Sequence, residues 1–136
     1  SEEDDSMRAV IERADPTLAD EAAGVLLQGV LPAIAAGERE RFGRWVGEFG
    51  RLNGAWYADE QGGVYRPPAG ELIEDLRASG AMSGVGQSSW GPTVYGVTDV
   101  EHAGAAREAA ETALDRVGVA GEVCIVAPRN TGALVD

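Results

Sequence analysis

The groups best suited to chemistry lie in a glycine-rich run from Gly80 to Gly96. Glycines let a backbone turn with positive φ and let a ligand approach the main chain closely. Successive exposed N–H groups then form a concavity that suits a phosphate or pyrophosphate. Gln87, Ser88 and Ser89 add neutral hydrogen-bonding groups, and Trp90 offers a flat face to an aromatic or sugar ring. The run predicts a neutral cradle for an anion and a ring, and a glycine-rich hairpin with a packed tryptophan is the alternative.

Two arginines in predicted loops extend this candidate site. Arg66 precedes two prolines, and Arg129 stands in the segment 128–132 beside Asn130. In such a loop a guanidinium can clamp a phosphate or a carboxylate through two parallel hydrogen bonds. Ion pairs with the abundant acidic residues are an equally weighted alternative.

Other chemistry finds little support in the sequence. His102 is the single histidine, and its position beside Glu101 in the first turn of a helix indicates a solvated surface role. Cys124 is the single cysteine, so neither a zinc site nor an internal disulfide is expected, which either favours a reducing compartment or is neutral as to compartment. No motif supplies a base for a serine nucleophile, so the sequence predicts no general acid or base.

The charge balance narrows the class of partner. Of 136 residues, 23 are acidic and 11 basic, every base is an arginine, and the net charge is −12. This balance argues against binding to nucleic acid through a basic patch. Salt shortens the range of such self-repulsion from ~10 Å at 0.1 M to ~3 Å at 1 M, so the composition suggests a salt-rich cytoplasm, with the drift of a GC-rich genome as the alternative.

No targeting or membrane segment is predicted. The apolar stretches are interrupted by Gln28, Pro32 and charged residues, and we expect none to reach the ~20 residues of a bilayer span. A secretory signal is not recognisable either. We therefore expect a cytoplasmic location and no membrane partner.

Helix signals cover most of the chain. A short helix around 7–13 is expected to stop at Asp15-Pro16, with Thr17 capping the next helix, which Pro32 kinks and Gly37 ends. Further helices are predicted over 38–56, from Pro67-Pro68 to Gly80, and from Asp99 to Val117.

Three strands are predicted, over 81–85, 93–98 and 123–127. The last is apolar at every position, which favours a central strand. The order predicts an α+β domain of residues 1–136, with helices packed on one face of a small, mostly antiparallel sheet. The final strand–helix–strand can close as a split crossover, with another strand between its parallel partners. Because three strands are few for an independent sheet, we expect a fourth upstream of Ser1.

The segment from Gly84 to Gly96 resembles the C-terminal part of β-ribofuranosylaminobenzene 5′-phosphate synthases, which belong to the GHMP kinase superfamily. Three other segments agree, at 31–42, 62–66 and 129–133. The resemblance implies a ferredoxin-like C-terminal domain of a two-domain enzyme, whose N-terminal domain carries a phosphate loop. It also implies a transferase that joins phosphoribosyl pyrophosphate to a para-substituted benzoate in methanopterin synthesis, with release of carbon dioxide and pyrophosphate.

The resemblance carries the superfamily's third motif onto Gly84, Gly86, Gln87, Ser88, Ser89, Trp90 and Gly91. Kinases of the superfamily have paired glycines where Gln87 and Ser88 stand here, which favours the synthase branch. No cofactor is expected within this chain, although Mg2+ could accompany phosphoribosyl pyrophosphate or ATP in the full-length protein. A small-molecule kinase and a non-catalytic ligand-binding or dimerisation module remain the alternatives, and a homodimer stays open.

Overall fold

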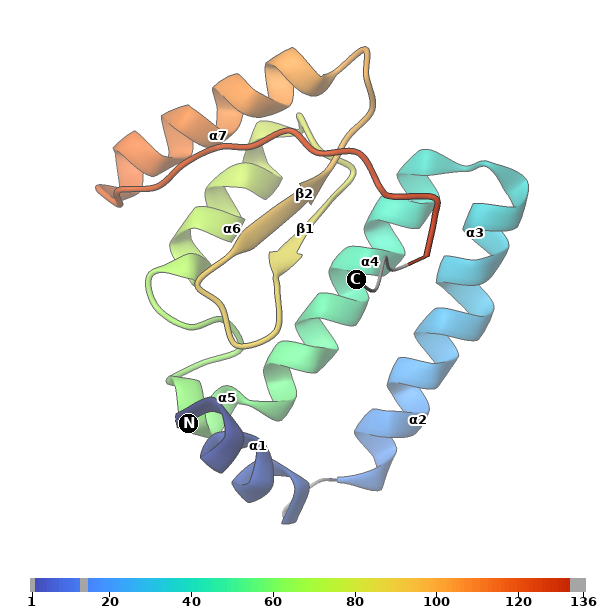
Figure 1. The fold of residues 1–136 in the computed structure, drawn as a ribbon, viewed down its shortest axis with the longest axis vertical. Helices are drawn as coiled ribbons and strands as arrows, with labels where there is room; N and C mark the ends of the chain where they lie inside the picture. The colour runs from blue at the N-terminus through green and yellow to red at the C-terminus, as the bar shows by residue number, and fades with distance from the viewer. Residues whose placement is uncertain (1, 13–14, 133–136) are drawn as a thin grey trace.

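The computed structural model describes residues 2–12 and 15–132. The chain runs as α1, α2, η1, α3, α4, α5, α6, β1, β2 and α7, followed by an extended tail, and a two-stranded sheet lies among the helices (Figure 1). The elements span Glu2–Glu12 (α1), Pro16–Val25 (α2), Leu26–Val30 (η1), Leu31–Ala36 (α3), Arg39–Trp56 (α4), Ala58–Gln61 (α5), Ala69–Ser79 (α6), Gly84–Gln87 (β1), Val94–Val97 (β2) and Ala103–Val117 (α7).

The helix ends follow from local signals. Gly37, Gly80 and Gly118 adopt left-handed φ values of 69°, 67° and 72° at the ends of α3, α6 and α7, as the sequence predicts. The expected cap at Thr17 is wrong by two residues. Asp15 is the cap, because its carboxylate accepts the Thr17 N–H at 2.9 Å and Pro16 suits the first helical position.

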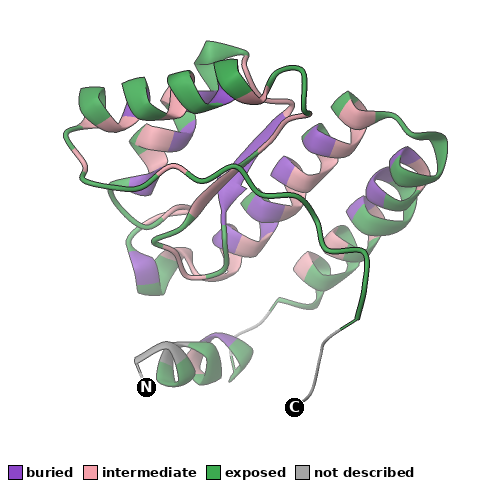
Figure 2. Cartoon of the chain, turned by 45° about the horizontal axis from the view of Figure 1, so that its top comes forward, coloured by how far each residue is buried: buried purple, intermediate pink, exposed green. Residues whose placement is uncertain are grey.

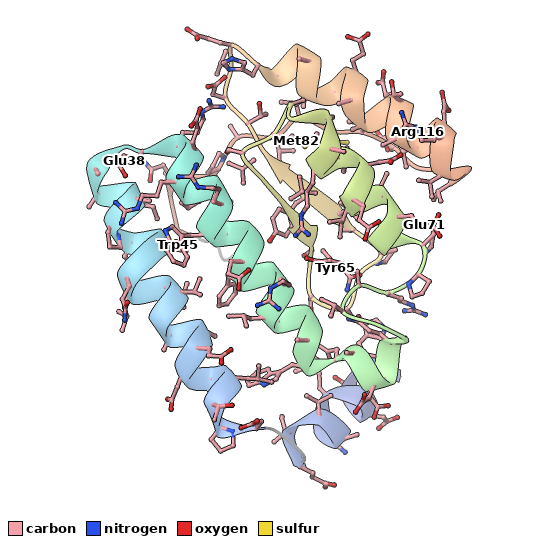
Figure 3. All side chains as sticks on the ribbon, turned by 180° about the vertical axis from the view of Figure 1, so that it is seen from behind. Glu38, Trp45, Tyr65, Glu71, Met82 and Arg116 are labelled. Carbon is pink, nitrogen blue, oxygen red and sulfur yellow. The ribbon has the colours of Figure 1, made fainter. Side chains whose placement is uncertain are left out.

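The stretch Pro16–Ala36 is continuously helical, and its middle turn, Leu26–Val30, widens to a π-helix just before Pro32. It is 21 residues long and contains an 18-residue window with a mean hydropathy of 1.3, so by length and composition alone it qualifies as a membrane span, contrary to expectation. A core helix of a water-soluble protein passes the same test. One face of the stretch packs on α4, where Trp45 covers Gly29 (Figure 3).

β1 and β2 pair antiparallel, with Val85 opposite Gly96 and Gly86 opposite Tyr95. Because side chains alternate along a strand, the sheet has two different faces. Val85 and Val94 pack on one face with Ile73 and Leu76 of α6 and Ala113 of α7. The burial of this layer is visible in Figure 2.

The opposite face of the sheet is covered by α4. A methyl group added at Gly84 would collide with the carbonyl of Gly43, and one at Gly47 would lie 3.3 Å from the Val85 oxygen. The glycines of α4 thus allow β1 to pack closely on this helix. The α+β class and the antiparallel sheet are confirmed, but helices cover both faces of the sheet rather than one.

The predicted central strand over 123–127 is wrong for the described chain. Residues 119–132 are extended but form no strand, and Val126 is 82% exposed. Arg107 Nη1 donates a hydrogen bond of 2.8 Å to the Val123 oxygen, which keeps the tail beside α7. The run is apolar enough for burial, but no strand among residues 2–12 and 15–132 pairs with it.

Candidate functional site

The loop between β1 and β2 is a tight turn with its own hydrogen bonds. The Ser88 N–H donates to the Thr93 oxygen and the Gly91 N–H to the Ser88 oxygen, both at 2.9 Å. Ser89 adopts a left-handed φ of 49° and Gly91 one of 80°. The N–H groups of Ser89 and Trp90 make no hydrogen bond within the described chain, and Ser88 and Ser89 are exposed. Two successive N–H groups are therefore without a partner in the described chain, and successive free N–H groups are the kind that can bind an anion.

Gln87 supports this loop from beneath. Its side chain is only 3% exposed, and its Oε1 accepts the Arg66 N–H at 2.8 Å. Its Nε2 donates to the Ser89 oxygen at 2.9 Å and to Gln61 Oε1 at 3.1 Å. Since each of these groups is used internally, Gln87 positions the loop and Arg66 rather than facing a ligand.

Arg66 and Trp90, 24 positions apart, meet at the loop surface. The Arg66 guanidinium carbon lies 5.7 Å from the centroid of the Trp90 ring, a cation–π geometry. The ring of Tyr57 meets the same indole edge-on at 5.7 Å between centroids. Arg66 is exposed, so its guanidinium can contact a ligand at the edge of the loop. The loop thus combines a cation, two N–H groups without a partner in the described chain, and an aromatic face.

The glycines predicted at this site divide into two kinds. Gly84 and Gly86 are buried, and added methyl groups would collide with Gly43 and with the Tyr95 side chain. The Tyr95 hydroxyl donates to the Val46 oxygen at 3.0 Å, and burial raises its pKa. These glycines therefore allow close packing against α4. Gly91 is at the loop itself, where its φ favours glycine.

Asn130 makes no contact with this cluster that would join it to the site. It is exposed on the extended tail and forms no hydrogen bond with the loop residues. The neighbouring Arg129 donates from Nε to Thr131 Oγ1 at 3.0 Å. His102 lies at the surface and pairs with Asp99 at 2.6 Å between Nδ1 and Oδ1, which accords with the solvated role expected for it.

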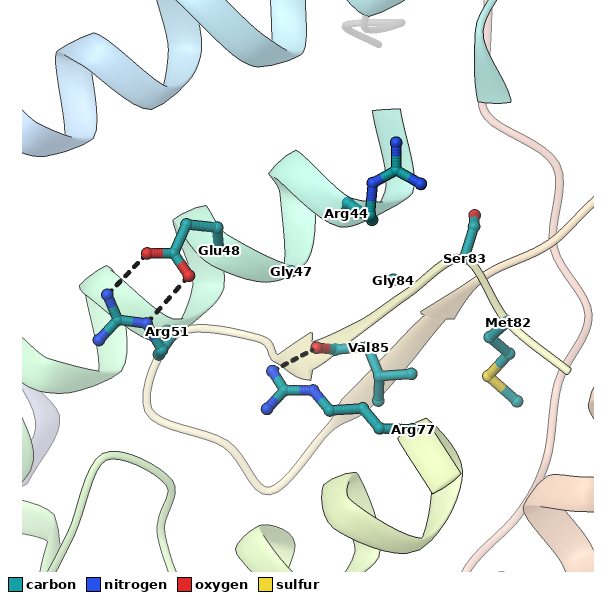
Figure 4. Close-up of a pocket in the computed structure, with 9 residues that line it drawn as sticks. All are labelled: Arg44, Gly47, Glu48, Arg51, Arg77, Met82, Ser83, Gly84 and Val85. Atoms are coloured by element: carbon teal, nitrogen blue, oxygen red, sulfur yellow. Dashed lines mark hydrogen bonds and ion pairs between the residues drawn. The ribbon is translucent and has the colours of Figure 1, made fainter. Parts of the chain in front are cut away.

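The structure contains a second polar site that the sequence does not predict. A cavity of about 310 Å³ lies between α4, α6 and the start of β1, and three arginines line it (Figure 4). The lining residues come from two helices and a strand and are spread between positions 44 and 85 of the chain, so no local sequence motif marks the cavity. The only available signal was the periodicity of Arg44 and Arg51, which places them on one side of α4.

Residues 30–116 match the family described as GHMP kinases, C terminal, so the chain belongs to that family. The match includes both strands and the candidate loop, and ends within α7.

A curated relative narrows the comparison. Over 111 residues the chain is 31% identical to a β-ribofuranosylphenol 5′-phosphate synthase of Methanothermobacter thermautotrophicus, covering 82% of this chain. The chain spans 31% of that relative's length. No solved structure matches the chain. The suspected relationship to these synthases is therefore confirmed.

Proposed function

We propose that this chain is the C-terminal, substrate-binding part of a transferase of the β-ribofuranosylaminobenzene 5′-phosphate synthase type. The observation that carries the proposal is the β1–β2 loop, where the N–H groups of Ser89 and Trp90 have no partner in the described chain and the Arg66 guanidinium lies 5.7 Å from the Trp90 ring centroid. That set can bind phosphate oxygens, while the Trp90 indole can stack on an aromatic acceptor. The similarity to a synthase over 111 residues supports the same conclusion.

The proposed reaction joins phosphoribosyl pyrophosphate to a para-substituted benzoate. The ring carbon that bears the carboxylate forms a bond to the anomeric carbon, and the bond from that carbon to pyrophosphate breaks. The carboxylate then leaves as carbon dioxide and returns its electron pair to the ring. With 4-hydroxybenzoate the product is a ribofuranosylphenol phosphate, the compound class in the relative's name.

The roles of the chain's own residues are binding and orientation. Arg66 is an always-charged group that neutralises phosphate oxygens, and its position depends on the bond from its N–H to Gln87. Charge at the leaving pyrophosphate grows as the anomeric bond breaks, so a fixed cation and two fixed N–H groups stabilise that stage of the reaction.

Mg2+ would accompany phosphoribosyl pyrophosphate as a counter-ion that offsets the charge of its phosphates. No three His, Cys, Asp or Glu side chains converge on one point in the described part of the chain. We therefore assign no step to a metal held by this domain.

The rest of the enzyme is proposed to lie outside this chain. In the described residues β2 pairs with β1 alone, and Ile125 and Val126 are 45% and 82% exposed. A further strand between β2 and the tail would pair the open edge and cover these side chains. We propose that an N-terminal domain supplies that strand and the phosphate loop, and that the isolated chain is therefore inactive.

An ATP-dependent kinase is the second candidate, favoured by the name of the family. In a kinase, the phosphoryl group that is transferred would have to approach the β1–β2 loop closely. Here the Gln87 carboxamide fills the space beneath the loop. A Cβ added at Gly91 would lie 3.2 Å from the Gln87 Cδ. This filling is the observation that favours the synthase.

The test uses the full-length gene product, supplied with phosphoribosyl pyrophosphate, Mg2+ and either 4-hydroxybenzoate or 4-aminobenzoate. We expect benzoate-dependent release of pyrophosphate, with little release when the benzoate is omitted. Parallel reactions with ATP and candidate acceptors should form no ADP. Acceptor-dependent ADP would establish the kinase instead, and the absence of both products with a ligand still bound would leave a non-catalytic binding module.

A further inference from the structure

The cavity between α4 and α6 is a separate site from the β1–β2 loop. The loop follows the last residue of β1, whereas the cavity lies at the first two, Gly84 and Val85. Figure 4 shows the Arg51–Glu48 pair on one side of the cavity and Ser83 and Met82 on the other, with Arg77 reaching in from α6. The lining residues are Arg44, Gly47, Glu48, Arg51, Arg77, Met82, Ser83, Gly84 and Val85.

The charge of this cavity is opposite to that of the protein. Three of the chain's 11 arginines line it, whereas Glu48 is its single acidic residue and the whole chain carries −12. Arg51 binds Glu48 through two hydrogen bonds of 2.6 and 3.0 Å, so this pair is neutral. Arg44 forms no ion pair with any described residue, and Arg77 has none either. Two guanidinium groups of the cavity are therefore left without a carboxylate in ion-pair contact.

Arg77 is fixed in place before any ligand binds. Its Nη2 donates to the Tyr65 hydroxyl at 2.8 Å and to the Val85 oxygen on the open edge of β1 at 3.1 Å. Its guanidinium carbon also lies 5.5 Å from the centroid of the Tyr65 ring. A guanidinium has five N–H donors, and those on Nε and Nη1 make no hydrogen bond to a described residue. The group is thus oriented and still has donors to offer.

The cavity suits a small ligand. A volume of about 310 Å³ is at the lower end of the range of small-molecule pockets. Gly47 and Gly84 line it where β1 packs closely on α4, so the charged groups that a ligand meets come from the arginine side chains. This shape fits an inorganic-type anion or the phosphate end of a metabolite better than a whole nucleotide.

We propose that this cavity is a second anion site, which binds a phosphate or diphosphate group between Arg44, Arg51 and Arg77. The site stands independently of the proposed transferase activity, because none of these residues belongs to the β1–β2 loop. Arg44 and Arg77 supply the uncompensated charge, and Arg51 shares its guanidinium between Glu48 and the ligand.

The test is a titration of the 136-residue chain with inorganic pyrophosphate and, separately, with phosphate, in low-salt chloride buffer. Calorimetry measures affinity, and amide chemical shifts locate the ligand. We expect shifts centred on Gly47 and on 83–85, and a loss of affinity of at least fivefold in Arg44→Gln and tenfold in Arg77→Gln. Arg41→Gln is the matched control, since Arg41 is on α4 but pairs with Glu38 outside the cavity.

Glu48→Gln separates binding from structural damage. It removes the single negative charge of the cavity and frees Arg51, so we expect tighter pyrophosphate binding by about threefold or more. A variant that merely disturbed the fold would bind more weakly. Shifts confined to 88–91, equal losses in Arg41→Gln and Arg44→Gln, or no binding of either anion at millimolar concentration would each overturn the proposal. Shifts confined to 88–91 would leave the loop's proposed role intact.

Discussion

Gln87 and Gln61, 26 positions apart, share a buried hydrogen bond of 3.1 Å from Nε2 to Oε1. Gln61 in turn donates to the oxygens of Gly54 and Val64 at 3.2 and 2.9 Å. The two amides thus connect the end of α4 to the β1–β2 loop. Because neither side chain is charged, both are buried at no ionic cost, with their donors and acceptors paired.

Replacing Gln87 by leucine should lower the free energy of unfolding by about 2–3 kcal/mol. The change leaves the Arg66 N–H and Gln61 Oε1 without their partner, and an unpaired buried group costs about 1–3 kcal/mol. Urea unfolding followed by circular dichroism measures the effect. Gln28→Leu is the control, because Gln28 is exposed on η1 and should change stability little. Equal losses in the two variants would show that the amide network contributes nothing particular.

Two glycine-to-alanine changes should act in opposite directions. Gly84→Ala places a methyl group against the Gly43 carbonyl and should cost about 1–3 kcal/mol. Gly24→Ala in α2 meets nothing within 4 Å and should gain up to about 1 kcal/mol from helix propensity. Thermal unfolding of both variants checks this. A stabilised Gly84→Ala protein would contradict the close packing of β1 on α4.

Local signals in the sequence located most of the helices, but α1 begins at Glu2 rather than near residue 7, and α5 was not predicted. Positive-φ glycines and proline positions mark helix ends within one turn, and the spacing of Phe42, Trp45 and Phe49 marks the buried face of α4. The run 123–127 misled, because apolar composition indicates a need for burial but not whether a partner strand exists in the same chain.

The candidate site was predicted in part. A glycine-rich run shows where a loop turns, so Ser89, Trp90 and Gly91 are found where expected. Whether a side chain within that run faces the ligand or the core depends on tertiary partners, and Gln87 faces the core because Gln61 and Arg66 lie there. The arginine cavity depends entirely on how α6 packs beside α4, which no spacing in the sequence encodes.

Glu48 should titrate below the ordinary glutamate pKa of 4.5. The hydrogen bonds from Arg51 are the main cause, burial opposes them, and the charges of Arg51 and Arg77 add to the lowering of the pKa. A carboxyl whose pKa is lowered by folding stabilises the fold above its unfolded pKa, and this contribution is lost as pH falls through the folded pKa. Carboxyl carbon shifts against pH measure it, and Arg51→Gln should return the pKa of Glu48 toward 4.5. An unchanged pKa in that variant would contradict the assignment.

Molar salt should stabilise the domain. With a net charge of −12, repulsion between acidic groups opposes folding, and salt reduces its range from ~10 Å at 0.1 M to ~3 Å at 1 M. Exposed pairs such as Arg41–Glu38 lose little, because such pairs contribute at most about 1 kcal/mol. We expect the Tm to rise by several degrees between 0.1 and 2 M KCl. An equal or lower Tm at 2 M would refute the salt-adapted interpretation of the composition.

The central claim is that the β1–β2 loop and Arg66 bind the substrate of a synthase-type transferase. Its most direct test is the KM for phosphoribosyl pyrophosphate of the full-length protein carrying Arg66→Gln, measured by benzoate-dependent pyrophosphate release. Arg116→Gln is the control, since Arg116 pairs with Asp75 at the surface. We predict a KM raised about tenfold, equivalent to ~1.4 kcal/mol of lost binding, with the Tm unchanged. A KM equal to that of the wild-type protein and of the Arg116→Gln control would contradict the claim.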